Sequence, residues 1–287
     1  MGRLFNIVEQ IRRGDAAIAH DTDIKIRSVA GGMAQRSNAG NGIKSDETLF
    51  HIVELLRERD GAGVTELADG LGVAKSTVHG HLTTLHEQEF VVKDDGEYRL
   101  GLGFFDYGQY VRGQLDVFKP GMFAVDRLEK ETGEMAWLIT HEGGKAMYVY
   151  GRGGENDINI DAILGSWVHM HCNSGGKAIL AHLPDDKVNR IVAEQGLPRR
   201  TENTITDPDR LREELARIRE RGHALNLSED LEGVHAIGVP LTFDGEIKGA
   251  LSIAGPAHRM PREHCEGEIL EQLEAATDEI ELNMAYQ

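Results

Sequence analysis

Three side chains that could bind a metal or act as a nucleophile lie close together in the sequence, at His169, His171 and Cys172. In an extended strand alternate residues share a face, so both histidines would point the same way. A tetrahedral metal site needs about four ligands, however, and no Cys-x-x-Cys pair supports one. A cysteine nucleophile needs a base beside it and an oxyanion hole, and the sequence signals neither. We therefore expect no metal, no cofactor and no catalytic residue, and an enzyme that uses residues 169–172 is the least favoured alternative.

A turn of small residues follows directly, at Ser174-Gly175-Gly176. It precedes a segment with helical spacing, so its backbone N–H groups would lie at a helix N-terminus, where a carboxylate is stabilised. The turn is not a phosphate-binding P-loop, because His171 stands where that motif needs glycine and Ala178 where it needs Ser or Thr. The alternative is structural, with Asn173 or Ser174 acting only as the helix cap.

Polar side chains also gather on one face of the helix expected to begin at Lys75. Val78, Leu82 and Leu85 recur at helical spacing and predict its buried face. The opposite face carries small, polar or basic residues that suit a DNA groove. With two basic residues from the segment that follows, the candidate DNA contacts are Lys75, Ser76, Thr77, His79, Thr83, Lys93 and Arg99.

The elements that must position this face occur in a characteristic order. A short apolar helix, capped by Thr65 and ended by Gly72, precedes the Lys75 helix. Two strand-like segments then flank Asp95-Gly96, a dipeptide typical of β-hairpins. This order predicts a winged helix-turn-helix DNA-binding domain over residues 45–101, in which the second helix reads the DNA.

The charge of the chain is unusual for a DNA-binding protein. The formal net charge is −17 over 287 residues, and residues 44–100 carry six Lys and Arg against twelve Asp and Glu. DNA affinity normally comes from basic side chains on phosphates. A host with very high internal salt would explain the balance, because salt screens the repulsion and an acidic surface keeps the protein soluble. The alternative is a small-molecule-binding or protein-interaction module whose helix-turn-helix no longer reads DNA.

The rest of the chain divides by composition and periodicity. Residues 1–44 are predicted to be a flexible extension, and residues 102–118 a linker helix whose aromatic side chains pack on a partner chain or on the second domain. Residues 119–287 mix helices with antiparallel strands and show no sustained βαβ alternation, which predicts an α+β domain with a central antiparallel sheet. The expected strands are 135–141, 145–151, 158–163, 234–243 and 246–254, and the expected helices are 120–132, 174–182, 185–195, 207–221 and 263–286.

Three segments together resemble the IclR family of transcriptional regulators. They are KSTVHGHLTTL, HMHCNSGGKAILAHLP, and IRERGHALNLSEDLEGVHAIGVPL followed by GEIKGALSIAGPAHRM. The resemblance covers roughly residues 45–286 and implies a winged helix-turn-helix, a linker helix, a GAF-like effector domain, and dimers or tetramers on operator DNA. It implies no enzymatic activity. Gly80 departs from the family, many members of which carry arginine at this position of the recognition helix.

The resemblance also implies where a small-molecule effector binds. The implied contacts are Ser174, Gly175, Gly176, Asn226, Ala236, Ser252 and Ala254. Backbone N–H groups of the 174–176 turn and the Ser252 hydroxyl would suit an anionic or polyhydroxylated metabolite, and the small residues would leave room for it. No run of about 18 apolar residues predicts a membrane span. With only two distant cysteines, the sequence predicts a cytoplasmic, ligand-responsive regulator.

Overall fold

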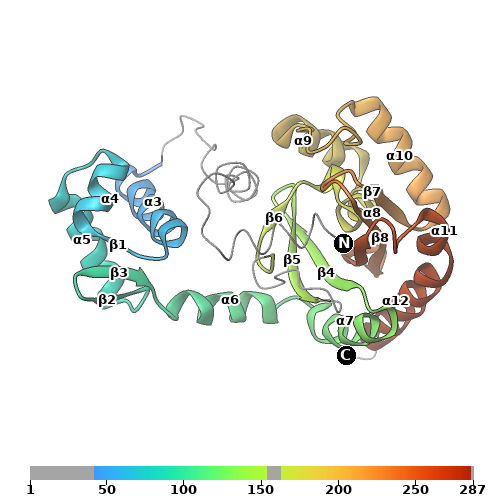
Figure 1. Cartoon of the computed structure of the whole chain (residues 1–287), viewed down its shortest axis with the longest axis horizontal. Helices are drawn as coiled ribbons and strands as arrows, with labels where there is room; N and C mark the ends of the chain where they lie inside the picture. The colour runs from blue at the N-terminus through green and yellow to red at the C-terminus, as the bar shows by residue number, and fades with distance from the viewer. Residues whose placement is uncertain (1–41, 154–162, 286–287) are drawn as a thin grey trace. The chain divides into compact units, whose positions relative to one another are not determined.

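The computed structural model describes residues 42–153 and 163–285, and it divides into two compact units (Figure 1). Within the described residues these units cover 42–115 and 116–285. The predicted N-terminal extension lies almost wholly outside the described residues, as does the strand expected at 158–163. Among the described residues, no helix is both long enough and apolar enough to cross a membrane.

The first unit is built on three helices that share one apolar core. Ile52 and Leu56 from the first helix meet Leu67 from the second and Val78 and Leu82 from the third, and each is at most 1% exposed. Burying these side chains stabilises the three helices, because most helical stability in a folded protein comes from packing of the apolar face. The helices are α3 (Lys44–Arg59), α4 (Val64–Leu71) and α5 (Lys75–Glu87).

The turn between α4 and α5 is the one the sequence predicts, but the start of α4 is not. Gly72 ends α4 with φ 65°, a left-handed conformation that glycine adopts without strain. The N-cap of α4 is Gly63, and no side chain caps the helix. Thr65 lies inside the first turn, so its expected capping role was wrong.

A three-stranded sheet completes this unit. Its central strand β3 pairs antiparallel with both neighbours, in the order β1-β3-β2. Asp95 and Gly96 both have positive φ, 46° and 88°, as a two-residue hairpin turn of the I′ type requires. The hairpin is the predicted wing, whereas β1 is too short for periodicity to reveal. The strands are β1 (Ala62–Gly63), β2 (Val91–Asp94) and β3 (Glu97–Leu100).

The helix after the wing is α6 (Gly103–Gly113), which is shorter than the predicted 102–118. Two of its aromatic rings pack on Phe90, at centroid distances of 4.8 Å for Phe104 and 5.5 Å for Tyr107. The sequence did not anticipate this contact within the unit. No residue of α6 is fully buried, and Phe105 and Tyr110 are 63% and 69% exposed.

The second unit contains a six-stranded sheet in the order β6-β5-β4-β9-β8-β7, with every pairing antiparallel. This confirms the α+β class and the central antiparallel sheet. The hairpins β4–β5 and β8–β9 fall where predicted, whereas β6 and β7 were missed. The strands are β4 (Met135–Glu142), β5 (Lys145–Arg152), β6 (Trp167–Val168), β7 (Ala224–Leu227), β8 (Val234–Phe243) and β9 (Glu246–Pro256).

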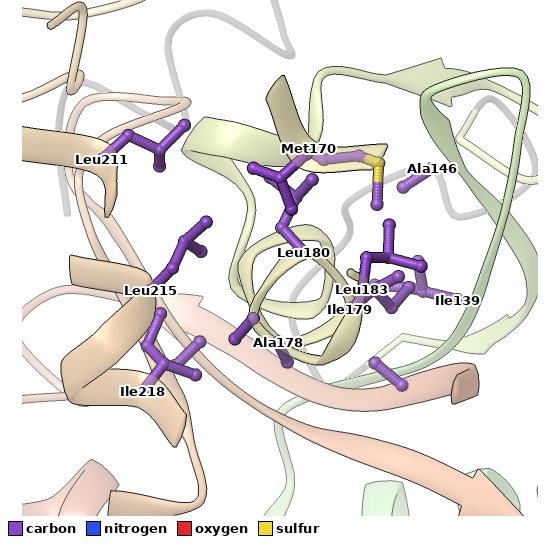
Figure 2. Packing of buried hydrophobic residues seen from close by; sticks show 14 of the residues in the cluster. Ile139, Ala146, Met170, Ala178, Ile179, Leu180, Leu183, Leu211, Leu215 and Ile218 are labelled. Atoms are coloured by element: carbon purple, nitrogen blue, oxygen red, sulfur yellow. The ribbon is translucent and has the colours of Figure 1, made fainter. Parts of the chain in front are cut away.

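Helices cover both faces of this sheet. Helix α8 packs on one face with α10 behind it, and α7 and α12 pack on the other (Figure 1). Ile139 of the sheet, Leu180 of α8 and Leu215 of α10 are at most 1% exposed and belong to one cluster (Figure 2). The helices are α7 (Phe118–Thr132), α8 (Ser174–His182), α9 (Asp185–Gln195), α10 (Pro208–Arg221) and α12 (Leu270–Ala285).

The C-terminal helix is interrupted, where the sequence predicts one helix over 263–286. A short segment α11 (Arg262–His264) is followed by a π-helical turn, η3 (Cys265–Ile269), and only then by α12. Gly267 lies in that turn with φ −103° and ψ −112°, outside the helical region. Glycine has the lowest helix propensity of any residue except proline, which explains why the break falls there.

Strand β5 contains a bulge that turns two tyrosines to opposite faces of the sheet. Tyr148 pairs with Ile139, which packs in the cluster around α8, whereas Tyr150 pairs with Leu138 on the other face. Val149 is the extra residue between them. Without a bulge, residues two apart would share a face.

Candidate functional site

The seven predicted DNA contacts are all exposed. Five of them lie on α5, which begins at Lys75 as predicted, and they face away from the buried Val78, Leu82 and Leu85. Lys93 and Arg99 come from the two strands of the wing. The unit thus presents a helix face and a hairpin, which are the two parts that a winged helix-turn-helix offers to a duplex.

Several of these side chains are already held by neighbours. Thr83 donates its hydroxyl hydrogen to the carbonyl of His79 over 2.9 Å. Lys93 lies 5.2 Å from the ring centre of Tyr98, and Arg99 is 3.8 Å from a carboxylate oxygen of Glu97. A Cβ atom at Gly80 would meet no heavy atom within 4 Å, so the surface has room for a larger side chain there.

The candidate effector residues on the sheet lie in two adjacent rows, each row being a set of residues paired across neighbouring strands. Asn226 pairs with Ala236, and Ala236 with Ala254, across β7, β8 and β9. Ser252 lies in the next row, opposite Trp137 of β4. These residues come from strands far apart in the sequence, and the sheet register brings them together on the face that α8 covers.

The N-terminus of α8 lies against this surface. The side chain of Asn173 caps the helix by accepting the Gly176 N–H over 3.0 Å. The hydroxyls of Ser174 and Ser252 lie 2.8 Å apart and form a buried hydrogen bond. Gly176 therefore already has a partner for the N–H group that the sequence assigns to a ligand.

The two glycines of the turn allow close packing. A Cβ atom at Gly175 would lie 2.5 Å from Cδ1 of Ile139, and one at Gly176 would lie 2.6 Å from the backbone of Met170. The volume expected at Gly175 is thus filled by the Ile139 side chain. A large residue at this position would force α8 from the sheet rather than fill a cavity.

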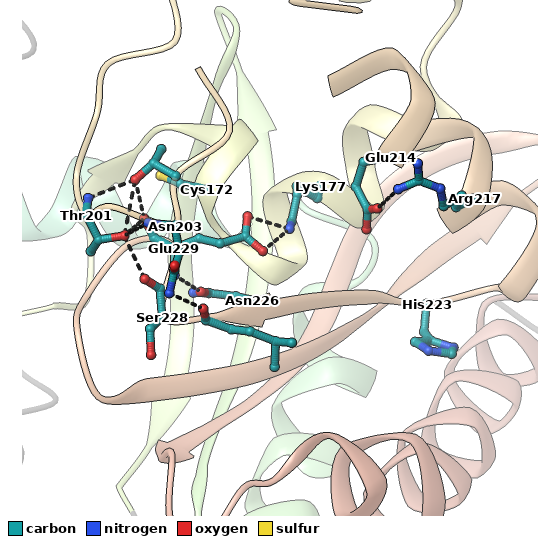
Figure 3. A network of polar contacts seen from close by, with 12 residues as sticks. Cys172, Lys177, Thr201, Asn203, Glu214, Arg217, His223, Asn226, Ser228 and Glu229 are labelled. Atoms are coloured by element: carbon teal, nitrogen blue, oxygen red, sulfur yellow. Dashed lines mark hydrogen bonds and ion pairs between the residues drawn. The ribbon is translucent and has the colours of Figure 1, made fainter. Parts of the chain in front are cut away.

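Beside the turn lies a buried ion pair that the sequence analysis missed. The Lys177 ammonium is 2.5 and 2.6 Å from the two carboxylate oxygens of Glu229, and only 1% of the lysine side chain is exposed (Figure 3). The Glu229 N–H donates to the side-chain oxygen of Asn226 over 2.7 Å. The pair joins α8 to the segment after β7 and holds the candidate residue Asn226 at their junction. A lysine directly before the apolar residues 178–181 was the available signal, but its partner lies 52 residues away.

Two aromatic residues beside the rows were also missed. The rings of Trp137 and Tyr148 are 4.7 Å apart between centroids. The Asn173 side-chain amide donates to the Tyr148 hydroxyl oxygen over 2.6 Å. Tyr148 thus reaches the residue that caps α8, a contact that depends on the bulge in β5.

The residues of the 169–172 cluster are packed and neutral. His171 and Cys172 lie in the 3₁₀ turn η2 (Met170–Cys172), with His169 as its N-cap, and not in the strand assumed from their alternation. Burial lowers the pKa of His171 to about 4, although its contact with the Pro198 carbonyl opposes this. Burial raises the pKa of the Cys172 thiol well above its ordinary value, so it is a poor nucleophile. Among the described residues, no group of three or more His, Cys, Asp or Glu side chains is placed to hold a metal ion.

A winged helix-turn-helix joined to a separate domain with an antiparallel sheet is an arrangement typical of DNA-binding transcriptional regulators. Comparison with known families gives the same result. Residues 49–95 match the IclR helix-turn-helix domain, and residues 109–282 match the bacterial transcriptional regulator IclR C-terminal domain. The chain belongs to the IclR family of transcriptional regulators, a family of gene regulators and not of enzymes.

Individual relatives cover most of the chain. It is 30% identical over 255 residues to the probable HTH-type transcriptional regulator ArcR of Halobacterium salinarum, which is 86% of this chain and 97% of the relative. The crystal structure of Thermotoga maritima IclR matches with a TM-score of 0.71 at 29% identity, covering 85% of this chain and 98% of that one. An IclR homologue from Microbacterium hydrocarbonoxydans, complexed with 4-hydroxybenzoate, shares the fold with a TM-score of 0.70 at 20% identity, covering 83% of this chain and 100% of that one.

Proposed function

We propose that this regulator reads operator DNA with the exposed face of α5 and the wing, and that a small effector bound beside the N-terminus of α8 changes its DNA affinity. The observation that carries the DNA-binding part is the exposure of the candidate contacts opposite a buried apolar face. In this proposal Lys75, Lys93 and Arg99 contact phosphates. The groove is read by Ser76, Thr77, His79 and Thr83.

The test is a gel-shift titration at molar KCl with the DNA upstream of the regulator's own gene. Lys75→Glu should weaken binding to specific and non-specific DNA alike, because it reverses a charge placed for phosphate. Thr77→Ala and His79→Ala should weaken specific binding more, by about 1–3 kcal/mol where a base edge is contacted. His51→Ala is the matched control, since His51 is also an exposed helical histidine but belongs to α3.

Footprints that stay unchanged in all three variants would contradict this assignment of the reading helix. Absence of any specific complex with the wild-type protein would favour the alternative, in which the helix-turn-helix domain binds protein. The acidic balance of residues 44–100 makes molar salt the informative condition, because repulsion from DNA is screened there.

The effector in this proposal is a small anionic or polyhydroxylated metabolite. Its site comprises Ser174, Asn226, Ala236, Ser252 and Ala254, with Gly175 and Gly176 setting the position of the α8 backbone. Support comes from the two rows that the sheet register forms beside a helix N-terminus, where negative charge is stabilised. A relative of the same fold is complexed with 4-hydroxybenzoate, which carries a carboxylate.

Four probes test this effector class on the full chain: pyruvate, glycolate and benzoate as carboxylates of different bulk, and ribose as a neutral polyol. At least one should raise the melting temperature and change the gel-shift midpoint, because a ligand that binds the folded protein stabilises it. A probe that raises the melting temperature but leaves the gel-shift midpoint unchanged would show that the ligand binds without regulating DNA affinity. No stabilisation by any of the four would overturn the proposed effector class.

The regulator acts in this proposal as a dimer or tetramer in the cytoplasm. Leu102, Phe105, Tyr107, Tyr110 and Val111 are 59–84% exposed on and next to α6, and they form the candidate contact between copies. A single winged helix covers too little DNA for tight, specific binding, whereas two copies can read two half-sites.

A further inference from the structure

The side chain of Asn173 has its orientation fixed by the helix that it caps. Its oxygen accepts the Gly176 N–H over 3.0 Å, so its NH₂ group points the other way. That group donates to the Tyr148 hydroxyl oxygen over 2.6 Å. Because the amide can only donate here, the tyrosine oxygen must be the acceptor in this hydrogen bond.

The hydroxyl hydrogen of Tyr148 is consequently directed away from Asn173. Within residues 42–153 and 163–285, no protein group accepts it. Tyr148 is half-buried, and a hydroxyl shielded from water in this way usually donates as well as accepts, since an unused donor costs free energy. Burial, together with the negative charge of Asp230, raises the pKa of Tyr148, so the hydrogen is retained at neutral pH.

The position of this donor relates it to the candidate effector site. The Tyr148 ring contacts Trp137, which pairs with Ser252 across β4 and β9. Its hydroxyl contacts Asn173, the residue before Ser174. Asp230 would repel an anion here, but Arg200 lies 3.1 Å from that carboxylate and offsets its charge.

We infer that Tyr148 is a specificity-determining residue of the effector site, whose hydroxyl donates a hydrogen bond to an oxygen of the effector, and that a small carboxylate is the ligand class it favours. The inference rests on the proposed effector function. It assigns to Asn173 a positioning role, because its capping bond decides which way the tyrosine hydrogen points.

The test compares two tyrosines on the same strand. Tyr148→Phe removes the unused donor and keeps the ring against Trp137. Tyr150→Phe is the matched control, because the Tyr150 hydroxyl already donates to Asp126 over 2.8 Å on the other face of the sheet. Dissociation constants are measured by calorimetry on the full chain with pyruvate, glycolate and benzoate.

We expect Tyr148→Phe to raise the dissociation constant of the bound carboxylate about tenfold, the loss typical of a hydrogen bond to a charged acceptor. Tyr150→Phe should change it less than about twofold. Asn173→Ser keeps a side chain that can cap α8 but removes the amide donor, so it should weaken binding by about threefold while the helix remains. This variant also tests the inference should Tyr148→Phe fail to fold, which its melting temperature would reveal.

If Tyr148→Phe changes the dissociation constant of a carboxylate that binds the wild-type protein by less than about twofold, the inference is overturned. The proposed function still stands in that case. Equal losses in Tyr148→Phe and Tyr150→Phe would also overturn the inference, because the effect would then not depend on the face of the sheet. If none of the three carboxylates binds the wild-type protein, the inference fails. Binding of ribose then decides whether a polyhydroxylated effector, and with it the proposed function, still stands.

Discussion

His171 is a histidine whose surroundings keep its ring neutral. It is 3% exposed, and its Nε2 atom lies 3.1 Å from the carbonyl oxygen of Pro198. Burial lowers its pKa to about 4, with the positive charges of Lys177 and Arg200 acting in the same direction. The folded state therefore excludes a proton that the unfolded chain would bind near its ordinary pKa.

This difference predicts that the second unit loses stability as the pH falls. Between the unfolded pKa of about 6.5 and the folded pKa of about 4, only the unfolded chain binds the proton, so the unfolding free energy falls by up to about 3 kcal/mol. Above pH 6.5 the contribution is fully present. Urea denaturation at several pH values should show this slope, and His171→Gln should flatten it.

His258→Gln is the control, because His258 is exposed. It should keep the wild-type dependence on pH. An unchanged slope in His171→Gln would assign the acid sensitivity to other groups, of which His169 and His141 are candidates because burial lowers the pKa of each.

At the scale of elements, the ion pair between Lys177 and Glu229 fastens α8 to the segment after β7. Lys177→Met should lower the unfolding free energy by about 3–5 kcal/mol, because it leaves a buried carboxylate without its partner. Lys177→Met combined with Glu229→Leu should recover much of the loss. Urea denaturation of the single and double variants measures both effects.

The surface pair Lys248–Glu246 provides the comparison for this prediction. Its atoms lie 2.6 Å apart, a spacing like that of the buried pair, but 73% of the Glu246 side chain is exposed. Lys248→Met should therefore leave stability nearly unchanged. Equal losses from Lys177→Met and Lys248→Met would show that burial does not set the strength of the Lys177 pair.

Sequence patterns predicted the elements whose ends carry local signals. Helices α8, α9 and α10 fall at or within one residue of their expected bounds, because Asn173, Pro184, Asp207 and Gly222 mark their ends. Asp207, for example, accepts the N–H groups of Asp209 and Arg210 over 3.0 and 2.9 Å. Such caps depend on neighbouring residues, so the sequence reveals them.

Features that depend on distant partners could not be predicted in this way. Strand β6 is two residues long and β7 four, too few to establish a period. The Lys177–Glu229 pair and the Ser174–Ser252 hydrogen bond join residues 52 and 78 positions apart. The packing of Gly175 on Ile139 is likewise set by how α8 lies on the sheet.

For the whole molecule, we predict at least a dimer in molar salt at micromolar concentration. The exposed side chains at 102–111 are large and apolar, and monomeric proteins rarely leave such a patch uncovered. Phe105→Ser with Tyr110→Ser should shift the mass measured by light scattering toward the monomer. Phe123→Ser is the control, because Phe123 is an equally exposed aromatic residue on α7.

A wild-type protein that scatters as a monomer would contradict this prediction. A dimer that survives the paired α6 substitutions would place the contact elsewhere. In either case the gel-shift stoichiometry on operator DNA reports independently how many copies bind.

The bulge at Val149 has a mechanical consequence. In a regular strand, side chains two residues apart lie on the same face of the sheet. Here Tyr148 contacts Asn173 on one side, and Tyr150 contacts Asp126 of α7 on the other. Any movement of this short stretch of β5 displaces both tyrosines at once. This stretch of β5 therefore joins, through two tyrosine hydroxyls, the N-cap residue of α8 to a residue of α7 on the opposite face of the sheet.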